Sequence, residues 1–387
     1  MFHVAPEEDI KKGKVTDVYF ETGVQILKAK NLDKHVKGEV RASALSDNWQ
    51  WAVLAGIEEL AQLFTGIEAD VYAMPEGTIF HPEEPVVVVE GQYTNFAVYE
   101  TPFLGLLCQA SGIATKAARC KLAADGRGVY SFGARRMHPA IAPMIERNAF
   151  IGGCDGVAVT ESAELIGEQP IGTMAHALIL VIGDEIETFK AFDEVMPPEI
   201  RRVALIDTFN DEKFAAVRAA QALGKKLFGV RLDTPGSRRG NFLKILQEVR
   251  WELNLRGFDY VKLFLSGGLD ESKILELNPF ADAYGVGTAI SNAPVVDFAF
   301  DLVEVEGKPM AKRGKMSGSK QVFRCKDCYE YHVVPAGKPS PVCTCGGDTE
   351  PLLKPLLIKG KLASPLPKPQ EIRKYVLEQI ERYSLNL

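Results

Sequence analysis

The feature that most constrains the fold is an alternation of short apolar segments with helical segments between residues 129 and 286. Six apolar segments have the length of buried strands: Val129–Phe132, Gly156–Val159, Val203–Ile206, Leu227–Leu232, Tyr260–Leu265 and Ala281–Val286. Helical patterns separate them, and residues 242–253 carry their apolar side chains on a single face. Alternating strands and helices at about 20–35 residues per unit indicate a parallel sheet. The apolar run within residues 169–182 is expected to hide one more short strand.

Nearly every predicted strand runs into polar or glycine residues at its C-terminal end. The segments are Gly133–Arg136, Thr160-Glu161, Asp207-Thr208, Asp233-Thr234, Ser266–Gly268 and Gly287-Thr288. In barrels and in open α/β sheets this edge holds the active site. Because six separate strands deliver such residues, the sequence favours a barrel over an open sheet.

The rest of the chain divides around this region. Residues 1–108 mix helical and strand patterns and are predicted to form an N-terminal α+β domain, and 109–298 form the α/β domain. Residues 299–387 form a C-terminal segment with a basic stretch at Lys308–Lys320, a cysteine cluster within 323–350 and an amphipathic helix near the end.

The cysteine cluster is the strongest single motif. Cys325-x2-Cys328 is followed by Cys343-x-Cys345, and four thiolates on two tight turns fit a tetrahedral zinc ion. A set of four unliganded thiols is the alternative, and His332 is a possible substitute ligand because C-x-C is less usual than C-x-x-C. With no coordination position left open, the predicted zinc is structural.

Composition excludes several classes of function. Lys and Arg number 45 against 51 Asp and Glu, a net charge of −6, so a chain-wide basic surface for nucleic acid is absent. The apolar run Ala177–Gly183 is far too short to span a membrane, and the charged N-terminal segment is no signal peptide. Cys108, Cys120 and Cys154 are scattered, which indicates a reducing compartment. We therefore expect a cytoplasmic protein that binds neither nucleic acid nor membrane.

Two pairs of groups at the strand ends suit a phosphorylated sugar. Backbone amides of the turns Ser266–Gly268 and Gly285–Thr288 can bind a phosphate, although ordinary turns also need glycine. Asp207 and Asp233, with Arg231 two residues before the second, suit ribose hydroxyls or hydrated Mg²⁺, although each Asp can equally cap a helix.

The remaining candidates each have an ordinary structural alternative. Arg135 and Arg136 can pair with a planar carboxylate beside the ring of Phe132, or with an acidic helix. His176, within an apolar run, is either a core residue or a nucleophile at a helix start. The basic stretch Lys308–Lys320 can surround phosphates, or it is simply solvated.

Taken in order, these motifs resemble those of the nicotinate phosphoribosyltransferases of the type II phosphoribosyltransferase class. The segments that carry the resemblance are Thr16–Tyr19, Phe132–Arg136, Asp155, His176, Asp207-Thr208, Arg231–Asp233, Ser266–Gly268 and Gly285–Thr288. The cysteine module is similar to that of shorter, archaeal-type members. The resemblance implies an irregular α/β barrel of about seven strands, an α+β domain built from both chain ends, and a homodimer or larger oligomer with shared active sites.

The resemblance also implies a reaction. Nicotinate and 5-phosphoribosyl 1-pyrophosphate would give nicotinate mononucleotide and pyrophosphate, a salvage step toward NAD, with ATP as co-substrate hydrolysed through a phosphohistidine. A nicotinamide or quinolinate phosphoribosyltransferase is the nearest alternative. A non-catalytic nucleotide-binding barrel and a zinc-ribbon nucleic-acid protein are alternatives from other classes.

By the same resemblance, the candidate residues take specific roles. The phosphate-binding group is Ser266, Gly267, Gly268, Gly285, Gly287 and Thr288, and the group for ribose or Mg²⁺ is Asp207, Asp233 and Arg231. The base would meet Arg135 or Arg136, Asp155, and the rings of Phe132 and of Tyr19 of the partner subunit. His176 would accept the phosphoryl group, with His138 as a second candidate and Thr173 as a nearby ligand contact. Lys312, Lys315 and Lys320 would serve pyrophosphate or the ATP phosphates.

Overall fold

The structure is a computed structural model that describes residues 2–385. The chain forms two compact units, each of which is described by itself: unit 1 contains residues 2–115 and 294–382, and unit 2 contains residues 116–293 and 383–385. The units therefore change over after Thr115 and Ala293, against the boundaries at 108 and 298 drawn from the sequence. None of the helices in the described chain has the length and apolar character needed to cross a membrane.

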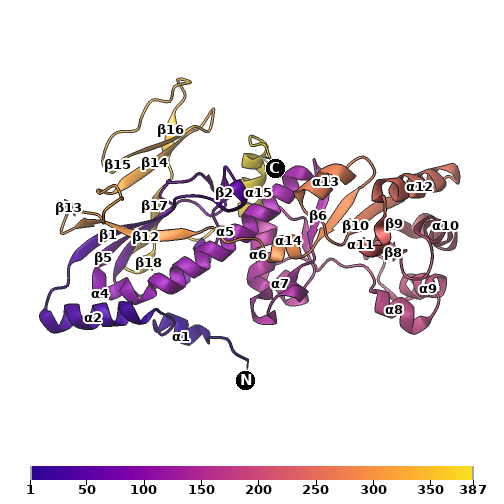
Figure 1. Ribbon diagram of the computed structural model, residues 1–387, viewed down its shortest axis with the longest axis horizontal. Coiled ribbons are helices and arrows are strands. Elements are labelled where there is room, and N and C mark those ends of the chain that lie inside the picture. The colour runs from indigo at the N-terminus through magenta and orange to yellow at the C-terminus, as the bar shows by residue number, and fades with distance from the viewer. Residues whose placement is uncertain (1, 386–387) are drawn as a thin grey trace. The chain divides into compact units, whose positions relative to one another are not determined.

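Unit 2 is built on one parallel sheet of six strands in the order β7-β6-β11-β10-β9-β8 (Figure 1). The strands are β6 (Gly128–Ser131), β7 (Gly156–Val157), β8 (Arg202–Leu205), β9 (Leu227–Leu232), β10 (Lys262–Ser266) and β11 (Ala283–Val286). Each overlaps one of the six strands predicted from the sequence. Within residues 2–385, no pairing joins the edge strands β7 and β8, so the sheet is a curled half-barrel of six strands rather than a closed barrel of about seven.

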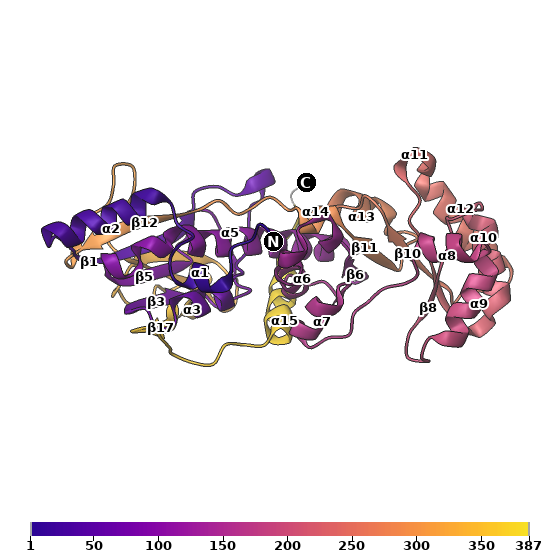
Figure 2. The ribbon, with the colours of Figure 1, turned by 90° about the horizontal axis from the view of Figure 1, so that it is seen from below.

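Helices alternate with these strands in unit 2. They are α6 (Ala142–Ile151), α7 (Thr160–Ile166), α8 (His176–Ile182), α9 (Glu185–Val195), α10 (Glu212–Leu223), α11 (Gly236–Arg239), α12 (Phe242–Leu255), α13 (Glu271–Leu277) and α14 (Thr288–Ser291). Figure 2 shows α9, α10 and α12 gathered beside β8 and β9. Apolar Ala215, Ala216, Ala219 and Ala220 form the buried face of α10, which lets the helix approach the sheet closely.

The extra strand expected within residues 169–182 is wrong. The run forms a loop followed by α8, which ends at Gly183 with φ 87°, a left-handed conformation that terminates a helix. An all-apolar run satisfies a helical and a strand period equally, so the pattern could not decide between them. Only Ile179 of α8 is buried, while Leu178, Leu180 and Val181 are exposed.

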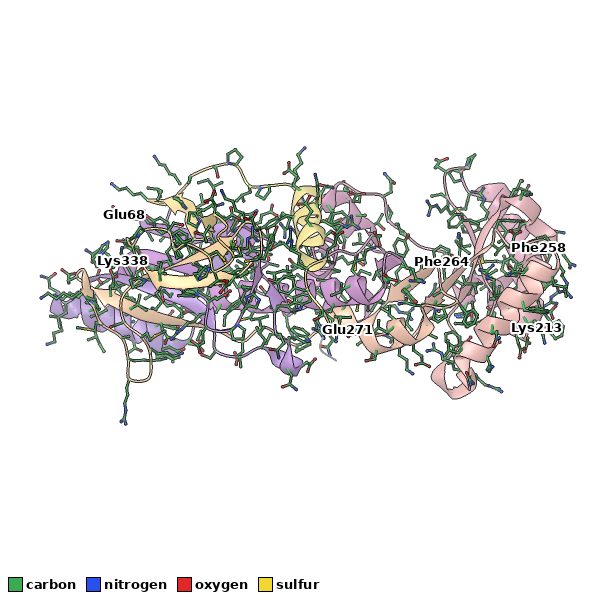
Figure 3. All side chains as sticks on the ribbon, turned by 90° about the horizontal axis from the view of Figure 1, so that it is seen from above. Glu68, Lys213, Phe258, Phe264, Glu271 and Lys338 are labelled. Atoms are coloured by element: carbon green, nitrogen blue, oxygen red, sulfur yellow. The ribbon has the colours of Figure 1, made fainter. Side chains whose placement is uncertain are left out.

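A buried ion pair fixes the helix that follows the glycine turn after β10. Glu271 lies in the first turn of α13 and is labelled in Figure 3. Its carboxylate accepts hydrogen bonds from Lys116 Nζ at 2.7 Å and Arg119 Nε at 3.0 Å, both on α5 (Glu100–Ala123). Two cations offset the cost of burying this carboxylate, and the contact holds α13 in place.

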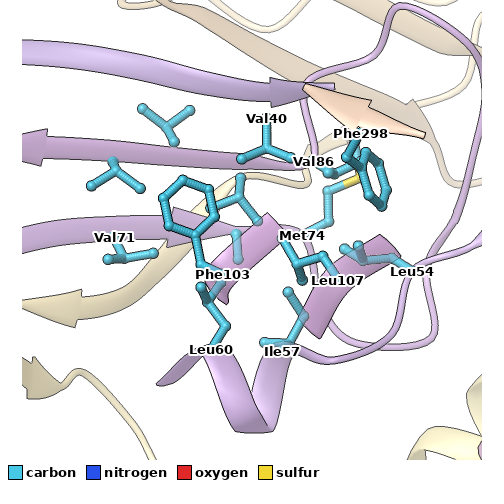
Figure 4. Close-up of a cluster of buried hydrophobic side chains, with 14 of the residues drawn as sticks. Val40, Leu54, Ile57, Leu60, Val71, Met74, Val86, Phe103, Leu107 and Phe298 are labelled. Carbon is cyan, nitrogen blue, oxygen red and sulfur yellow. The ribbon is translucent and has the colours of Figure 1, made fainter. Parts of the chain in front are cut away.

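Unit 1 contains an antiparallel seven-stranded sheet in the order β13-β12-β1-β5-β3-β17-β18. The strands are β1 (His35–Ala42), β3 (Ala69–Ala73), β5 (Val87–Gln92), β12 (Phe298–Val305), β13 (Lys308–Pro309), β17 (Lys354–Ile358) and β18 (Lys361–Leu362). Helices α3 (Ile57–Phe64) and α5 supply apolar side chains to the core on this sheet, and Figure 4 shows Leu60 and Phe103 facing Val40 and Val71. Both chain ends therefore contribute to one core, as the resemblance implied.

The cysteine module belongs to unit 1 and has little core of its own. Its sheet has three strands in the order β15-β14-β16, with β14 (Lys320–Cys325), β15 (Tyr331–Pro335) and β16 (Thr349–Pro351). Helix α15 (Pro369–Ile380) buries Ile372, Val376 and Ile380. Since so few side chains of the module are buried, four clustered cysteines are well suited to bracing it.

Candidate active site

Unit 2 contains a cavity of about 560 Å³ at the carboxyl ends of its strands. Polar and apolar residues from almost every strand end line it, among them Phe132, Arg135, Arg136, Glu146, Thr173, His176, Arg231, Asp233, Ser266, Gly267, Gly268, Gly285, Gly287 and Thr288. The structure thus brings together thirteen of the residues singled out in the sequence. A cavity of this size is typical of a small-molecule site.

His176 is the first residue of α8 and is held by three groups. Its Nδ1 is 3.0 Å from Thr208 Oγ1, and its Nε2 is 3.7 Å from both Asp207 Oδ2 and Asp233 Oδ2. When Nδ1 carries the proton and donates it to Thr208, the lone pair of the ring lies on Nε2. The side chain is 38% exposed, so this nitrogen is accessible to a ligand.

Arg231 ties three strand ends together. Its Nη2 is 3.2 Å from Asp233 Oδ2, its Nε donates to Ser266 Oγ at 2.9 Å, and its Nη1 donates to Thr173 Oγ1 at 3.1 Å. Ser266 Oγ in turn donates to Asp233 Oδ1 at 2.8 Å. These charge-assisted contacts preorganise Asp233 at the cavity wall.

Asp207 differs from Asp233 because it does not line the cavity. Its side chain is 2% exposed, and neither carboxylate oxygen has a hydrogen-bond partner in residues 2–385. Burial raises the pKa of this carboxyl, the charge of His176 opposes the rise, and Asp233 adds to it. A buried carboxylate without a hydrogen-bond partner, beside a second carboxylate, is a donor set that fits a hydrated divalent cation.

The glycines of the two turns are required by geometry. Gly267 and Gly268 have φ values of 83° and 63°, where side chains are strained. At Gly285 a Cβ would lie 2.3 Å from the ring of Phe132, so only glycine lets that ring lie against β11. The Phe132 ring centroid is also 5.4 Å from the guanidinium carbon of Arg231. The turns therefore leave backbone and an aromatic face at the cavity.

Arg135 and Arg136 lie in a short 3₁₀ helix directly after β6, and both are exposed at the cavity. Because both line it, the question of strand phase raised by the sequence does not arise, and either guanidinium can reach a carboxylate there.

Two site residues were missed in the sequence. Glu146 of α6 is fully buried, and its carboxylate accepts from the amides of Ala158 at 3.1 Å and Val159 at 2.9 Å. Arg239 donates from Nη2 to the carbonyls of Ser266 at 3.1 Å and Gly267 at 2.8 Å. Both side chains shape the turns after the strands. A charged residue among apolar neighbours in α6 was the available signal for Glu146.

Other predicted site residues lie elsewhere. Asp155 does not line the cavity; it accepts from Lys121 Nζ at 2.7 Å and from the Val129 amide at 2.8 Å. His138 is exposed, and its Nδ1 accepts from the Ala140 amide. Tyr19, Lys312, Lys315 and Lys320 belong to unit 1. Tyr19 is exposed, and the three lysines pair with the carboxylates of Asp301 and Glu39.

The four clustered cysteines lie close enough to share one ion. Cys325 Sγ is 3.5 Å from Cys345 Sγ, and Cys328 Sγ is 3.4 Å from Cys343 Sγ. All four sulfur atoms lie within 4.8 Å of one another. Glu330 and His332 form a second possible set with Cys343. The geometry of the four sulfurs fits a tetrahedral metal site.

Known proteins share this architecture. Residues 17–111 match the family model of the N-terminal domain of quinolinate phosphoribosyl transferase, and residues 113–301 match that of its C-terminal domain. A nicotinate-nucleotide pyrophosphorylase from Pyrococcus furiosus superposes with a TM-score of 0.98 at 59% identity, covering 100% of this chain and 99% of that one. Human nicotinic acid phosphoribosyltransferase shares the fold, with a TM-score of 0.76 at 20% identity over 95% of this chain and 94% of that one.

A curated relative narrows the class. Nicotinate phosphoribosyltransferase pncB2 of Mycobacterium tuberculosis is 33% identical over 328 residues, which cover 80% of this chain and 65% of the relative. The chain therefore spans less than two thirds of the length of that relative. The two domain matches and the half-barrel define a type II phosphoribosyltransferase. Within that class, the chain belongs to the nicotinate phosphoribosyltransferase family.

Proposed function

We propose that this protein transfers the phosphoribosyl group of 5-phosphoribosyl 1-pyrophosphate to nicotinate, giving nicotinate mononucleotide and pyrophosphate in NAD salvage. The observation that carries the proposal is the single cavity of unit 2, which is lined by two glycine turns, two exposed arginines, an aromatic ring and His176. These groups match a sugar phosphate, a carboxylate, a planar ring and a phosphoryl group in turn.

The base is expected between Phe132 and the arginines. The pyridine nitrogen attacks the anomeric carbon as pyrophosphate leaves, so positive charge develops on the ring and no strong acid or base is needed. Arg135 or Arg136 pairs with the single carboxylate of nicotinate. Arg231 is already bound by Asp233, Ser266 and Thr173, and the lining found in residues 2–385 includes no lysine. A second carboxylate, as in quinolinate, would thus lack a free cation.

The sugar phosphate is expected at the turns. Amides after β10 and β11 bind the 5-phosphate, and Asp233 binds a ribose hydroxyl. Asp207 and Asp233 would also hold Mg²⁺, which when bound neutralises part of the pyrophosphate charge. The buried, unpaired carboxylate of Asp207 supports this assignment.

His176 is the proposed phosphoryl acceptor for ATP coupling. Its Nε2 would form a bond to the γ-phosphorus as the bond to the ADP oxygen breaks, and water later hydrolyses the phosphohistidine. Thr208 supports the required tautomer through Nδ1, and Asp207 and Asp233 orient the ring. His138 is the weaker candidate because it lies outside the cavity lining.

Two further assignments complete the proposal. The cysteine module binds one structural zinc ion. The enzyme is a homodimer or larger, in which Tyr19 of the partner subunit stacks on the base. The exposure of Tyr19 and its place in unit 1 support that role.

The test is an assay of the purified protein with Mg²⁺, 5-phosphoribosyl 1-pyrophosphate and one base at a time, with and without ATP. Nicotinate turnover that ATP enhances is expected, followed as mononucleotide by chromatography. Turnover with quinolinate or nicotinamide instead would overturn the assignment of the arginines. No turnover with any base in folded protein would favour a nucleotide-binding protein without catalysis.

A further inference from the structure

The basic loop of unit 1, residues 310–318, is anchored at both ends on one carbonyl group. The amides of Met310 and Gly318 donate to Val303 O of β12 at 3.0 and 2.9 Å, and the Ser319 amide donates to Glu304 Oε1 at 2.8 Å. The loop follows β13 and precedes β14, which are labelled in Figure 1. Its base is therefore fixed to β12, while Lys312 and Arg313 are exposed.

Two buried carboxylates lie beneath this loop. Glu39 of β1 and Asp301 of β12 face each other in register, and their side chains are 1% and 2% exposed. Two adjacent buried carboxylates are costly unless cations pair with them. Lys320 Nζ is 2.9 Å from Glu39, and Lys312 Nζ and Lys315 Nζ are 2.7 and 3.0 Å from Asp301.

The three lysines are not equivalent. Lys320 is 9% exposed and also donates to the carbonyls of Met316 at 3.2 Å and Gly318 at 2.9 Å, so its ammonium group is fully used inside the protein. Lys315 is 20% exposed. Lys312 is 67% exposed, and an exposed ion pair of this kind contributes only about 0–1 kcal/mol. When Lys312 leaves Asp301, Lys315 still pairs with that carboxylate.

We propose that Asp301 is a positioning residue for polyphosphate recognition. It holds Lys312 and Lys315 on one side of the loop, so that Lys312, with Arg313 beside it, transfers from Asp301 to the diphosphate or triphosphate group of a substrate. Lys320 and Glu39 serve the loop's structure and do not contact the ligand. This inference rests on the proposed function for the identity of its ligands, which are the pyrophosphate ester and ATP.

The test compares Asp301→Asn, Lys312→Met and their combination. Asp301→Asn and Lys312→Met are each expected to raise the KM of one phosphate substrate about 10-fold, with kcat and the KM of nicotinate changed less than about twofold. Separate titrations of 5-phosphoribosyl 1-pyrophosphate and ATP show which of the two is bound. In the Lys312→Met protein, Asp301→Asn is expected to add less than about twofold, because Asp301 acts through Lys312.

Asp297→Asn is the matched control, since Asp297 is exposed and directly precedes β12; its kinetics should equal those of the unmodified protein. Thermal melting checks that Asp301→Asn folds. If it does not fold, Lys312→Met still tests the inference, because its side chain is exposed. Additive effects of the two substitutions, or an equal rise in the KM of nicotinate, would overturn it.

Direct binding separates this inference from the proposed function. Calorimetric titration with inorganic pyrophosphate and with ATP needs no turnover. Binding that Lys312→Met weakens about 10-fold, in a protein without turnover, would support the loop and refute the activity. Normal turnover with unchanged phosphate affinities in both variants would refute the loop alone.

Discussion

The two units treat buried charge in opposite ways. In unit 1, Glu39 and Asp301 are each neutralised by lysines of the same loop. In unit 2, the carboxylate of Asp207 is equally buried, yet its oxygens lack hydrogen-bond partners in the described chain and its ion-pair contact is His176 at 3.7 Å. A satisfied pair stabilises the fold, whereas an unsatisfied charge at a cavity costs stability and is available to a ligand. The comparison thus separates residues expected to set stability from residues expected to set activity.

The largest effect is expected at His176. His176→Ala should abolish the stimulation by ATP and lower turnover roughly 100-fold or more, because no other group offers a nitrogen between the two carboxylates. Its melting temperature should hardly change, since the side chain is partly exposed. Acid-labile labelling by γ-labelled ATP measures the phosphoryl group.

The same labelling distinguishes the two histidines. His138→Ala should retain the label. Label lost from His138→Ala and kept in His176→Ala would exchange their roles and break the comparison for unit 2.

The second effect lies in unit 1 and concerns stability. Replacing Cys325 and Cys328 together by Ser should remove about one equivalent of zinc and lower the melting temperature by about 5–10 °C, because metal binding supplies folding free energy to the module. Metal analysis and calorimetry measure both. Cys108→Ser is a suitable control, since Cys108 lies outside the cluster. Unchanged metal content and stability would refute the zinc site.

The third effect tests the base site of unit 2. Arg135→Ala and Arg136→Ala are compared, and the one that pairs with nicotinate should raise its KM about 10- to 100-fold, as expected for loss of a charged hydrogen bond. Steady-state kinetics with nicotinate varied at saturating phosphoribosyl donor give the values. Equal, small effects from both variants would mean that another group recognises the carboxylate.

The smallest effect concerns the pH dependence of stability through Glu100 of unit 1. Burial, followed by the charge of Asp301, raises the pKa of Glu100 to about 7 from 4.5, while Lys312 opposes the rise. The folded state therefore binds more protons than the unfolded state between about pH 4.5 and 7, so this group lowers stability as pH rises through that window.

Glu100→Gln should remove that contribution and melt at a slightly higher temperature than the unmodified protein at pH 8, with little difference at pH 4.5. Melting curves across this range give the comparison. A lower melting temperature at pH 8 would show that the charged form of Glu100 stabilises unit 1.

The sequence predicted the six strands of unit 2 because each is a short apolar run that ends in polar or glycine residues. It also placed most cavity residues, since the ends of parallel strands meet at one edge. It failed for residues 169–182, where an all-apolar run fits either period. It could not show that Asp207 is buried behind the cavity lining, or that Lys320 is used by Glu39, because both facts depend on contacts between residues far apart in the chain.

The open edge of the half-barrel has a consequence for movement. His176 lies in the segment that runs from β7 to β8, the two strands that pairing does not join in residues 2–385, and α8 contributes no strand to the sheet (Figures 1 and 2). A shift of α8 therefore breaks the contact between His176 and Thr208 but no hydrogen bond of the β-ladder. The histidine can approach and withdraw from a bound nucleotide while the phosphate-binding turns stay fixed.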